Sequence, residues 1–196
     1  MKKILIINGS LGGSKGNTKI MIDECQPILR VNKCTIEVLH LKDFFSSGTD
    51  NKLEAIRKAM DQADGYIFTT GTYWDSWGSP LQRFLEMITE FEATDVLLYK
   101  PCAVLITMHS VGGKEVLSRL QGVLNTMGLL IPPMSGLVYA LSTHLAIEAQ
   151  SEFAADFWSK EDLQIVLHNL MTSVHKQNNF MAWPVDKKDP LRLWNK

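Results

Sequence analysis

The feature that most constrains the fold is a series of short, continuous apolar runs. The first, KILII at residues 3–7, consists largely of branched apolar residues and stops at Asn8-Gly9-Ser10. A strand in a parallel sheet that is covered on both faces has this continuous pattern, whereas a strand with one solvated face alternates. Shorter or interrupted stretches of apolar and β-branched residues predict four more strands, at residues 35–39, 66–70, 103–107 and 136–140.

Stretches with helical spacing of apolar residues separate these strands. Asn17 or Thr18 can cap the first helix, which Pro27 would kink or shorten. Another helix is expected to start at Ser79-Pro80, because serine caps free amides and proline at the first helical position loses no needed hydrogen bond. Three more helices are predicted, and the first covers residues 52–63. The second follows a Gly112-Gly113 turn, and its apolar face carries Val116, Leu117, Leu120, Leu124 and Met127. The third starts at Ser159 and Asp162, and its apolar face carries Leu163, Val166, Leu167, Leu170, Met171 and Val174.

This alternation of strands and helices predicts βαβ units. Their right-handed crossovers build an α/β fold with a doubly wound, five-stranded parallel sheet and helices on both faces. The 196 residues suffice for one substantial core, so one domain is expected over residues 1–176. The tail at residues 177–196 lacks periodicity but carries aromatic residues and prolines. We expect it to pack on its own domain or on a partner subunit.

Composition excludes several classes of partner. Lys and Arg number 20 against 21 Asp and Glu, so no positive field favours a nucleic acid or an anionic membrane, and a small-molecule partner is expected. The opening MKKILIINGS has too short an apolar run for a signal peptide or a membrane span, which predicts a cytoplasmic location. The three cysteines and five histidines show neither a disulfide framework nor metal-ligand spacing, so no metal centre is expected.

The loop after the first strand, residues 9–18, is a candidate anion site, and we call it the anion loop. It places glycines, including Gly16, the hydroxyls of Ser10 and Ser14, and the ammonium of Lys15 just before a helix start. Free amides and the helix dipole favour a phosphate there. The spacing matches neither a dinucleotide GxGxxG motif nor a P-loop, and it suits a single phosphate monoester such as that of FMN.

Two later loops also follow strands, and parallel strands place ligands at their carboxyl ends. Residues 70–78, the aromatic loop, contain Tyr73 and Trp74, which are candidates to stack on a planar isoalloxazine. Residues 107–113 contain Gly112 and Gly113, whose backbone amides can approach the pyrimidine edge of a flavin. For His109 in this third loop, a loop hydrogen bond is favoured over proton donation to a substrate.

Three segments carry a resemblance to a known family: NGSLGGSKGNT at residues 8–18, FTTGTYWDSWGSPLQRFL at 68–85 and KPCAVLITMHSVGG at 100–113. In order and spacing they resemble the NAD(P)H-dependent FMN reductases, which are flavodoxin-like proteins, over roughly residues 1–140. The resemblance implies that Ser10, Ser14, Asn17 and Thr18 hold the FMN phosphate, that Thr72, Tyr73 and Trp74 border the isoalloxazine, and that Gly112 and Gly113 contact its far edge. It also implies a homodimer or higher homo-oligomer. The full set of expected cofactor-binding residues is Ser10, Ser14, Lys15, Gly16, Asn17, Thr18, Thr70, Gly71, Thr72, Tyr73, Trp74, Asp75, His109, Ser110, Gly112 and Gly113.

Two residues depart from that family's pattern. Gly71 stands where the family usually has proline, and Asp75 stands where it usually has glycine. A carboxylate near the flavin would oppose the anionic reduced form and repel acidic substrates.

The expected activity is transfer of a hydride from NADH or NADPH through FMN to a flavin, quinone, azo or nitroaromatic acceptor. No catalytic side chain is expected, because the cofactor carries the chemistry. A flavodoxin-type electron carrier without nicotinamide activity, a hydrolase and a non-catalytic binding module remain alternatives on the same fold.

Overall fold

A computed structural model describes residues 1–149, 158–174 and 180–183. Within these residues, one all-parallel sheet contains β1 (Lys3–Asn8), β2 (Thr35–His40), β3 (Gly65–Gly71), β4 (Cys102–Met108) and β5 (Gly136–Ala140). The strand order is β2-β1-β3-β4-β5, which is that of the flavodoxin-like fold. The structure therefore confirms the predicted fold class.

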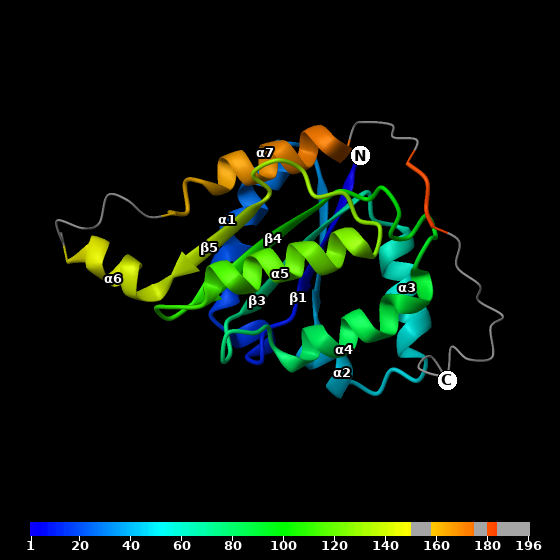
Figure 1. Ribbon diagram of the computed structural model, residues 1–196, viewed down its shortest axis with the longest axis horizontal. Coiled ribbons are helices and arrows are strands. Elements are labelled where there is room, and N and C mark those ends of the chain that lie inside the picture. The colour runs from blue at the N-terminus through cyan, green and yellow to red at the C-terminus, as the bar shows by residue number, and fades with distance from the viewer. Residues whose placement is uncertain (150–157, 175–179, 184–196) are drawn as a thin grey trace.

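Helices cover both faces of the sheet (Figure 1). On one face lie α1 (Thr18–Val31) and α7 (Leu163–Val174), and on the other lie α3 (Lys52–Asp61), α4 (Ser79–Ile88) and α5 (Gly113–Thr126). Successive residues of β1 alternate between the two cores: Ile4 and Ile6 pack against α1 and α7, whereas Leu5 and Ile7 pack on the opposite side. A strand that is apolar on both faces explains the continuous apolar run in the sequence.

Two predicted details of the helices are wrong. Gly78, not Ser79, is the N-cap of α4, and its amide donates to the hydroxyl of Thr70 over 3.1 Å. Glycine is needed at position 78 because a Cβ there would lie 2.6 Å from the Gly9 carbonyl oxygen. Pro27 does not shorten α1, which continues to Val31 because its buried face packs into the core.

Two short helices were not expected. They are α2 (Leu41–Ser46) and α6 (Leu141–Glu148), and each starts at the residue directly after a strand ends. Because no turn separates each strand from the helix that follows it, the sequence has no turn residues there that would mark the start of the helix. The single-turn segments η1 (Gly13–Lys15) and η2 (Thr89–Phe91) complete the described elements.

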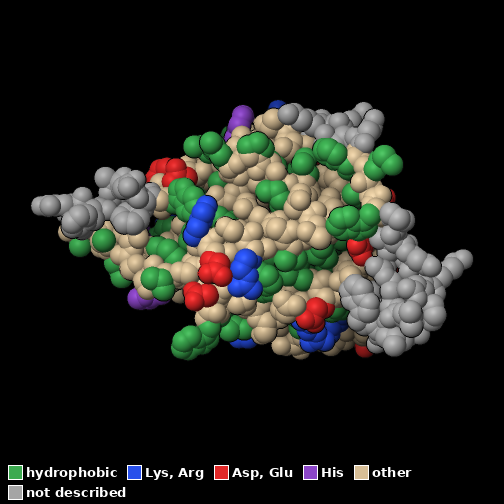
Figure 2. All heavy atoms as spheres, viewed as in Figure 1, with side chains coloured by type: hydrophobic (Ala, Val, Ile, Leu, Met, Phe, Trp, Pro, Cys, Tyr) green, Lys and Arg blue, Asp and Glu red, His purple; other side chains and the backbone are tan. Residues whose placement is uncertain are grey.

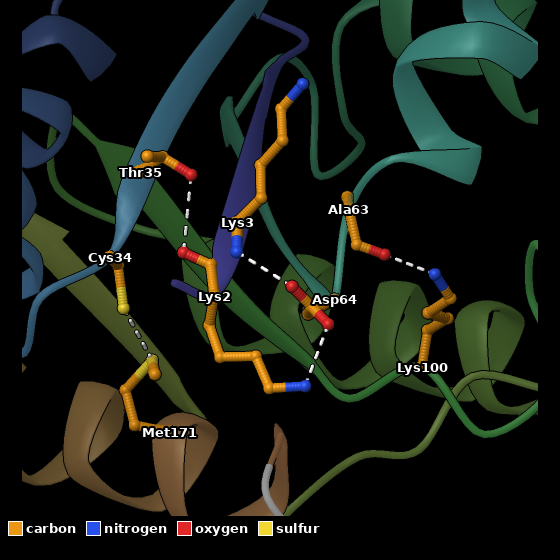
Figure 3. A network of polar contacts seen from close by, with 8 residues as sticks. All are labelled: Lys2, Lys3, Cys34, Thr35, Ala63, Asp64, Lys100 and Met171. Carbon is orange, nitrogen blue, oxygen red and sulfur yellow. Dashed lines mark hydrogen bonds and ion pairs between the residues drawn. The ribbon is translucent and has the colours of Figure 1, made fainter.

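The amino ends of the strands are tied together by the network in Figure 3. A carboxylate oxygen of Asp64, just before β3, accepts the Lys3 amide over 2.8 Å, and its other oxygen accepts the Lys2 ammonium over 2.9 Å. Burial opposes ionisation of Asp64, but these two donors outweigh it and hold its pKa below the usual value. In the same network, the thiol of Cys34, directly before β2, contacts the sulfur of Met171 on α7 over 3.5 Å.

Residues 180–183 contact the body of the domain. The ring of Phe180 stacks on Tyr99 with 5.9 Å between ring centroids, and the Tyr99 hydroxyl donates to the Phe180 carbonyl. The indole N–H of Trp183 donates to Glu92 over 2.8 Å. The rest of the predicted tail, including Pro184 and Trp194, lies outside the described residues.

Candidate functional site

A cavity of about 480 Å³ opens at the carboxyl ends of β1, β3, β4 and β5, beside the start of α1. Ligands of open α/β sheets bind at this edge. Its size falls within the range of small-molecule pockets. The residues that line it are Ser10, Leu11, Gly12, Gly16, Asn17, Ile20, Gly71, Thr72, Tyr73, Thr107, Met108, His109, Tyr139 and Leu141.

The buried side chain of Asn8, the last residue of β1, organises the anion loop from inside. Its carbonyl oxygen accepts the Ser10 amide over 3.1 Å and the Thr18 hydroxyl over 3.0 Å. Its amide nitrogen donates to the Gly13 carbonyl over 3.0 Å. These contacts bind the two ends and the middle of the loop to one residue, so the loop is preformed.

Two glycines let the anion loop close on itself. A Cβ on Gly16 would lie 2.4 Å from the Ser10 hydroxyl oxygen, and a Cβ on Gly12 would lie 2.4 Å from the Gly16 Cα. Real side chains do not fit such gaps, so both positions require glycine. The loop also closes the first turn of α1, because the Lys19 and Ile20 amides donate to the Gly16 and Asn17 carbonyls over 2.9 and 3.1 Å. What the helix start offers an anion beside the cavity is therefore its dipole.

Three predicted phosphate-binding residues of the anion loop do not line the cavity. The Ser14 amide donates over 2.9 Å to Asp43 of α2, and the hydrogen bonds from Ser14 hold the pKa of Asp43 below its usual value. The Thr18 hydroxyl is buried against Asn8. The side chain of Lys15 is exposed. Ser10, Gly16 and Asn17 of the same prediction do line the cavity.

The aromatic loop reverses in a tight turn between Tyr73 and Ser76, whose backbones exchange hydrogen bonds of 2.8 and 3.0 Å. Its two central residues, Trp74 and Asp75, have φ values of 48° and 56°. Positive φ at both central positions defines a type I′ turn and costs roughly 1 kcal/mol for each non-glycine residue. The turn leaves Trp74 fully exposed, away from the cavity lining.

Tyr73 lines the cavity and joins the aromatic loop to the anion loop. Its hydroxyl accepts the Leu11 amide over 3.2 Å and lies 3.4 Å from the Ser10 hydroxyl. Its ring folds back over Gly71, where a Cβ would lie 2.9–3.1 Å from the phenol atoms. Glycine instead of the family's proline at position 71 therefore makes room for this ring.

Asp75 faces the third loop and does not line the cavity. One of its carboxylate oxygens would lie 2.0 Å from a Cβ on Gly112, which has a left-handed φ of 83°. The Asp75 carbonyl also accepts a hydrogen bond of 3.0 Å from Arg119 on α5. Thr70, which ties the end of β3 to Gly78, is likewise outside the lining.

In the third loop, His109 is exposed and lines the cavity, while its carbonyl accepts the Ser142 amide over 3.0 Å. The Gly113 amide donates to the sulfur of Met108 over 3.3 Å. Ser110, Gly112 and Gly113 lie outside the lining. The structure therefore brings His109 to the cavity but keeps the predicted glycine amides back from it.

Two orphaned hydroxyls mark the cavity as a polar ligand site. Among the described residues, the buried hydroxyls of Thr72 and Tyr139 have no hydrogen-bond partner, and both residues line the cavity. Burial raises the pKa of Tyr139. An unpaired buried hydroxyl costs about 1–3 kcal/mol, which a bound ligand with polar groups would recover. A phosphate ester with a hydroxylated chain, such as FMN, fits a lining of this chemistry.

Sequence reasoning missed Asn8 and the contributions of β5, Tyr139 and Leu141. For Asn8 there was a signal: a polar residue directly after four buried apolar ones, at the edge where ligands bind. For Tyr139 there was none, because an aromatic residue within a strand reads as core.

The cysteines and the potential metal ligands of the described residues are spread through the fold. Cys25, Cys34 and Cys102 are free and buried, and burial raises the pKa of the Cys25 thiol to about 12. No group of three or more potential metal ligands lies together in the part of the chain that the structure describes. Among the same residues, no helix is both long and apolar enough to cross a membrane.

Solved structures with similar folds come from flavin enzymes and oxidoreductases. RosB with its bound flavin intermediate is 15% identical and has a TM-score of 0.71, with 97% of this chain and 93% of that chain covered. An oxidoreductase from Corynebacterium diphtheriae is 18% identical, with a TM-score of 0.70 and coverage of 91% and 99%. The apo form of the NADH:FMN oxidoreductase EmoB is 19% identical, with a TM-score of 0.64 and coverage of 89% of each chain.

At these identities the similarity shows the fold alone, and no curated protein matches the sequence. A family model gives the stronger result: the model of the NADPH-dependent FMN reductases matches residues 2–143. The match includes β1 to β5, the anion loop and the aromatic loop. The chain therefore belongs to the NADPH-dependent FMN reductase family and is an oxidoreductase of the flavoprotein class.

Proposed function

We propose that this protein is an FMN-dependent oxidoreductase that passes electrons from NADH or NADPH to a flavin, quinone, azo or nitroaromatic acceptor. The observation that carries the proposal is the cavity itself. It combines a preformed anion loop with the orphaned hydroxyls of Thr72 and Tyr139, in a chain of the FMN reductase family. When bound, FMN would supply the hydride and electron chemistry that no side chain in the cavity provides.

In this proposal the anion loop holds the phosphate. Ser10, Gly16 and Asn17 line the cavity beside the start of α1, where the helix dipole favours an anion. Thr18 acts by fixing Asn8, and Ser14 acts by holding Asp43.

The other loops would border the ring system. Gly71 at the end of β3 lines the cavity together with Thr72 and Tyr73 of the aromatic loop, and His109 lines it directly after β4. Thr70, Trp74, Asp75, Ser110, Gly112 and Gly113 would shape these loops from outside the lining. With Asp75 turned toward Gly112, its carboxylate lies outside the cavity lining, which lessens the expected repulsion of a reduced flavin.

The near-neutral net charge supports a small-molecule acceptor over a protein that docks by charge. The net charge is −1, and on the face in Figure 2 basic and acidic side chains lie near one another without an extended patch of either sign. Electron carriers that dock on protein partners depend on such a patch.

We also propose that the protein is a homodimer. Helix α6 projects from the body in Figure 1, and it has no buried residue. Leu145 and Ile147 on this helix are 54% and 41% exposed. A second copy of the chain would cover these apolar side chains.

The proposed activity predicts that purified protein binds FMN and that NADH or NADPH bleaches the flavin absorbance under anaerobic conditions. The nucleotide that bleaches faster is the donor. Bound flavin that neither nucleotide reduces would contradict the reductase proposal and favour an electron carrier. Absence of any FMN binding would contradict the cofactor assignment.

A matched pair of variants tests the site. The hydroxyls of Thr72 and Thr69 are both buried without a partner, but only Thr72 lines the cavity. Thr72→Val should weaken FMN binding roughly tenfold, because it removes a hydroxyl that the ligand would satisfy. Thr69→Val should leave FMN binding unchanged. Equal dissociation constants for both variants, measured by flavin fluorescence titration, would move the ligand away from Thr72.

A further inference from the structure

The corner between β2 and α2 contacts the anion loop from outside the cavity. His40 ends β2, and one of its ring nitrogens, Nδ1, lies 2.9 Å from the side-chain nitrogen of Asn8. His40 does not line the cavity, so any effect on a ligand there must pass through Asn8.

Two backbone groups fix the orientation of the Asn8 side-chain amide, because one can only donate a hydrogen bond and the other can only accept one. Its oxygen faces the amide of Ser10, which can only donate. Its nitrogen faces the carbonyl of Gly13, which can only accept. The atom of Asn8 that meets His40 is therefore the NH2 nitrogen, which can only donate.

It follows that Nδ1 of His40 must accept. A neutral imidazole with its proton on the other nitrogen, Nε2, meets this requirement. An imidazolium does not, because both of its nitrogens carry protons and two donors would then face each other. Proton uptake by His40 therefore breaks this contact and disturbs the residue that holds Ser10, Gly13 and Thr18.

An acidic side chain lies near His40. Asp43 on α2 lies within electrostatic reach of His40 and also next to Lys42, and it is held by the Ser14 amide. From β1, the neutral Asn8 faces His40, and η1, which packs on α2, carries the exposed Lys15.

We propose that His40 is a positioning residue for the anion loop, acting through Asn8, and that the loop keeps its ligand-binding shape only while Nδ1 of His40 carries no proton. This inference rests on the proposed function, since FMN is the ligand whose phosphate the loop would hold. It assigns a role to a residue of an edge strand that makes no contact with the cavity.

Two variants of His40 distinguish the effect of its hydrogen-bond acceptor from the effect of its protonation. His40→Asn places a carbonyl oxygen near the position of Nδ1, so it keeps the acceptor but cannot titrate. His40→Leu removes the acceptor at every pH. We expect the dissociation constant for FMN to rise roughly tenfold in the wild type between pH 8 and pH 5.5, relative to His40→Asn. His40→Leu should bind as weakly at pH 8 as the wild type does in acid.

The FMN phosphate also titrates, and this changes the dissociation constant of both proteins alike. Comparing the wild type with His40→Asn therefore cancels that contribution. Parallel pH profiles of the wild type and His40→Asn would overturn the proposal. So would tighter binding by the wild type in acid, since the charge of the imidazolium would then dominate.

A readout without cofactor distinguishes this inference from the proposed function. In the protein alone, ¹⁵N NMR should show Nδ1 of His40 unprotonated at pH 8, and the Ser10 amide should exchange with solvent faster in His40→Leu than in His40→Asn. If these results hold but no FMN binds, the proposed function fails and the positioning role stands. A protonated Nδ1 at pH 8, or equal exchange rates, would overturn the positioning role whatever the ligand.

Discussion

Gly12 and Gly16 face each other across the anion loop, and the space between them decides what the loop can hold. A methyl group on Gly16 would meet the Ser10 hydroxyl at 2.4 Å and the Gly12 backbone at 3.0 Å. We expect Gly16→Ala to weaken FMN binding at least tenfold and to lower the free energy of unfolding by about 1–3 kcal/mol, because the loop must open to admit the methyl group. Flavin titration and urea unfolding measure the two effects.

Gly122 on α5 provides the control, because it is exposed and a Cβ there meets nothing within 4 Å. Gly122→Ala should raise the free energy of unfolding by about 1 kcal/mol through helix propensity and leave FMN binding unchanged. If both glycine variants bind FMN like the wild type, the anion loop is not the phosphate site. The sequence marked this loop through its glycines and hydroxyls, but which groups face the cavity depends on Asp43 and Asn8, which lie outside the Gly-rich stretch.

Among the elements, the junction of β1 with β3 depends on Asp64. Because its pKa is lowered in the folded protein, its contribution to stability is present above the pKa of an unfolded aspartate, about 4, and is lost as the pH falls through the lower folded value. Asp64→Asn should therefore destabilise the protein by about 1 kcal/mol at pH 7, and the difference from the wild type should shrink toward pH 3.

The matched control is Asp61→Asn, which removes an exposed helix ion pair with Arg57 and should cost only tenths of a kcal/mol. Equal unfolding curves for the two variants at pH 7 would contradict the role of Asp64. The sequence predicted all five strands: β1, β3 and β4 are runs of largely buried residues, whereas β2, TIEVLH at the sheet edge, has no buried residue and is indicated by its alternation of apolar and polar residues. It missed α2 and α6, because a helix that starts at the residue after a strand leaves no turn to detect.

For the whole molecule, the cofactor and the fold should be linked thermodynamically. FMN at one hundred times its dissociation constant adds about 2.7 kcal/mol to the free energy of unfolding, which for a chain of this size raises Tm by roughly 5–10 °C. Riboflavin, which lacks the phosphate, should give a much smaller shift at the same concentration. Equal shifts in differential scanning calorimetry would indicate that the anion loop does not contribute to binding.

The doubly wound α/β class was predictable because βαβ crossovers have one hand and continuous apolar strands must be buried on both faces, whereas the flavodoxin-like strand order was implied by the family resemblance. The lining of the cavity was only partly predictable. Tyr139 belongs to β5, where the sequence pattern predicts which residues are buried but not which of them contact a ligand.

The network around Asp64 and the cavity lie at opposite ends of the same strands. Lys2 and Lys3, the partners of Asp64, are not among the residues that line the cavity, so the free energies of changes at the two ends should add. Stability at the amino ends of the strands and the shape of the cavity at their carboxyl ends can therefore be engineered separately. A variant stabilised at the amino ends can serve as the parent for libraries that reshape the cavity, because the stability that such libraries lose has been supplied at the end of the sheet away from the cavity.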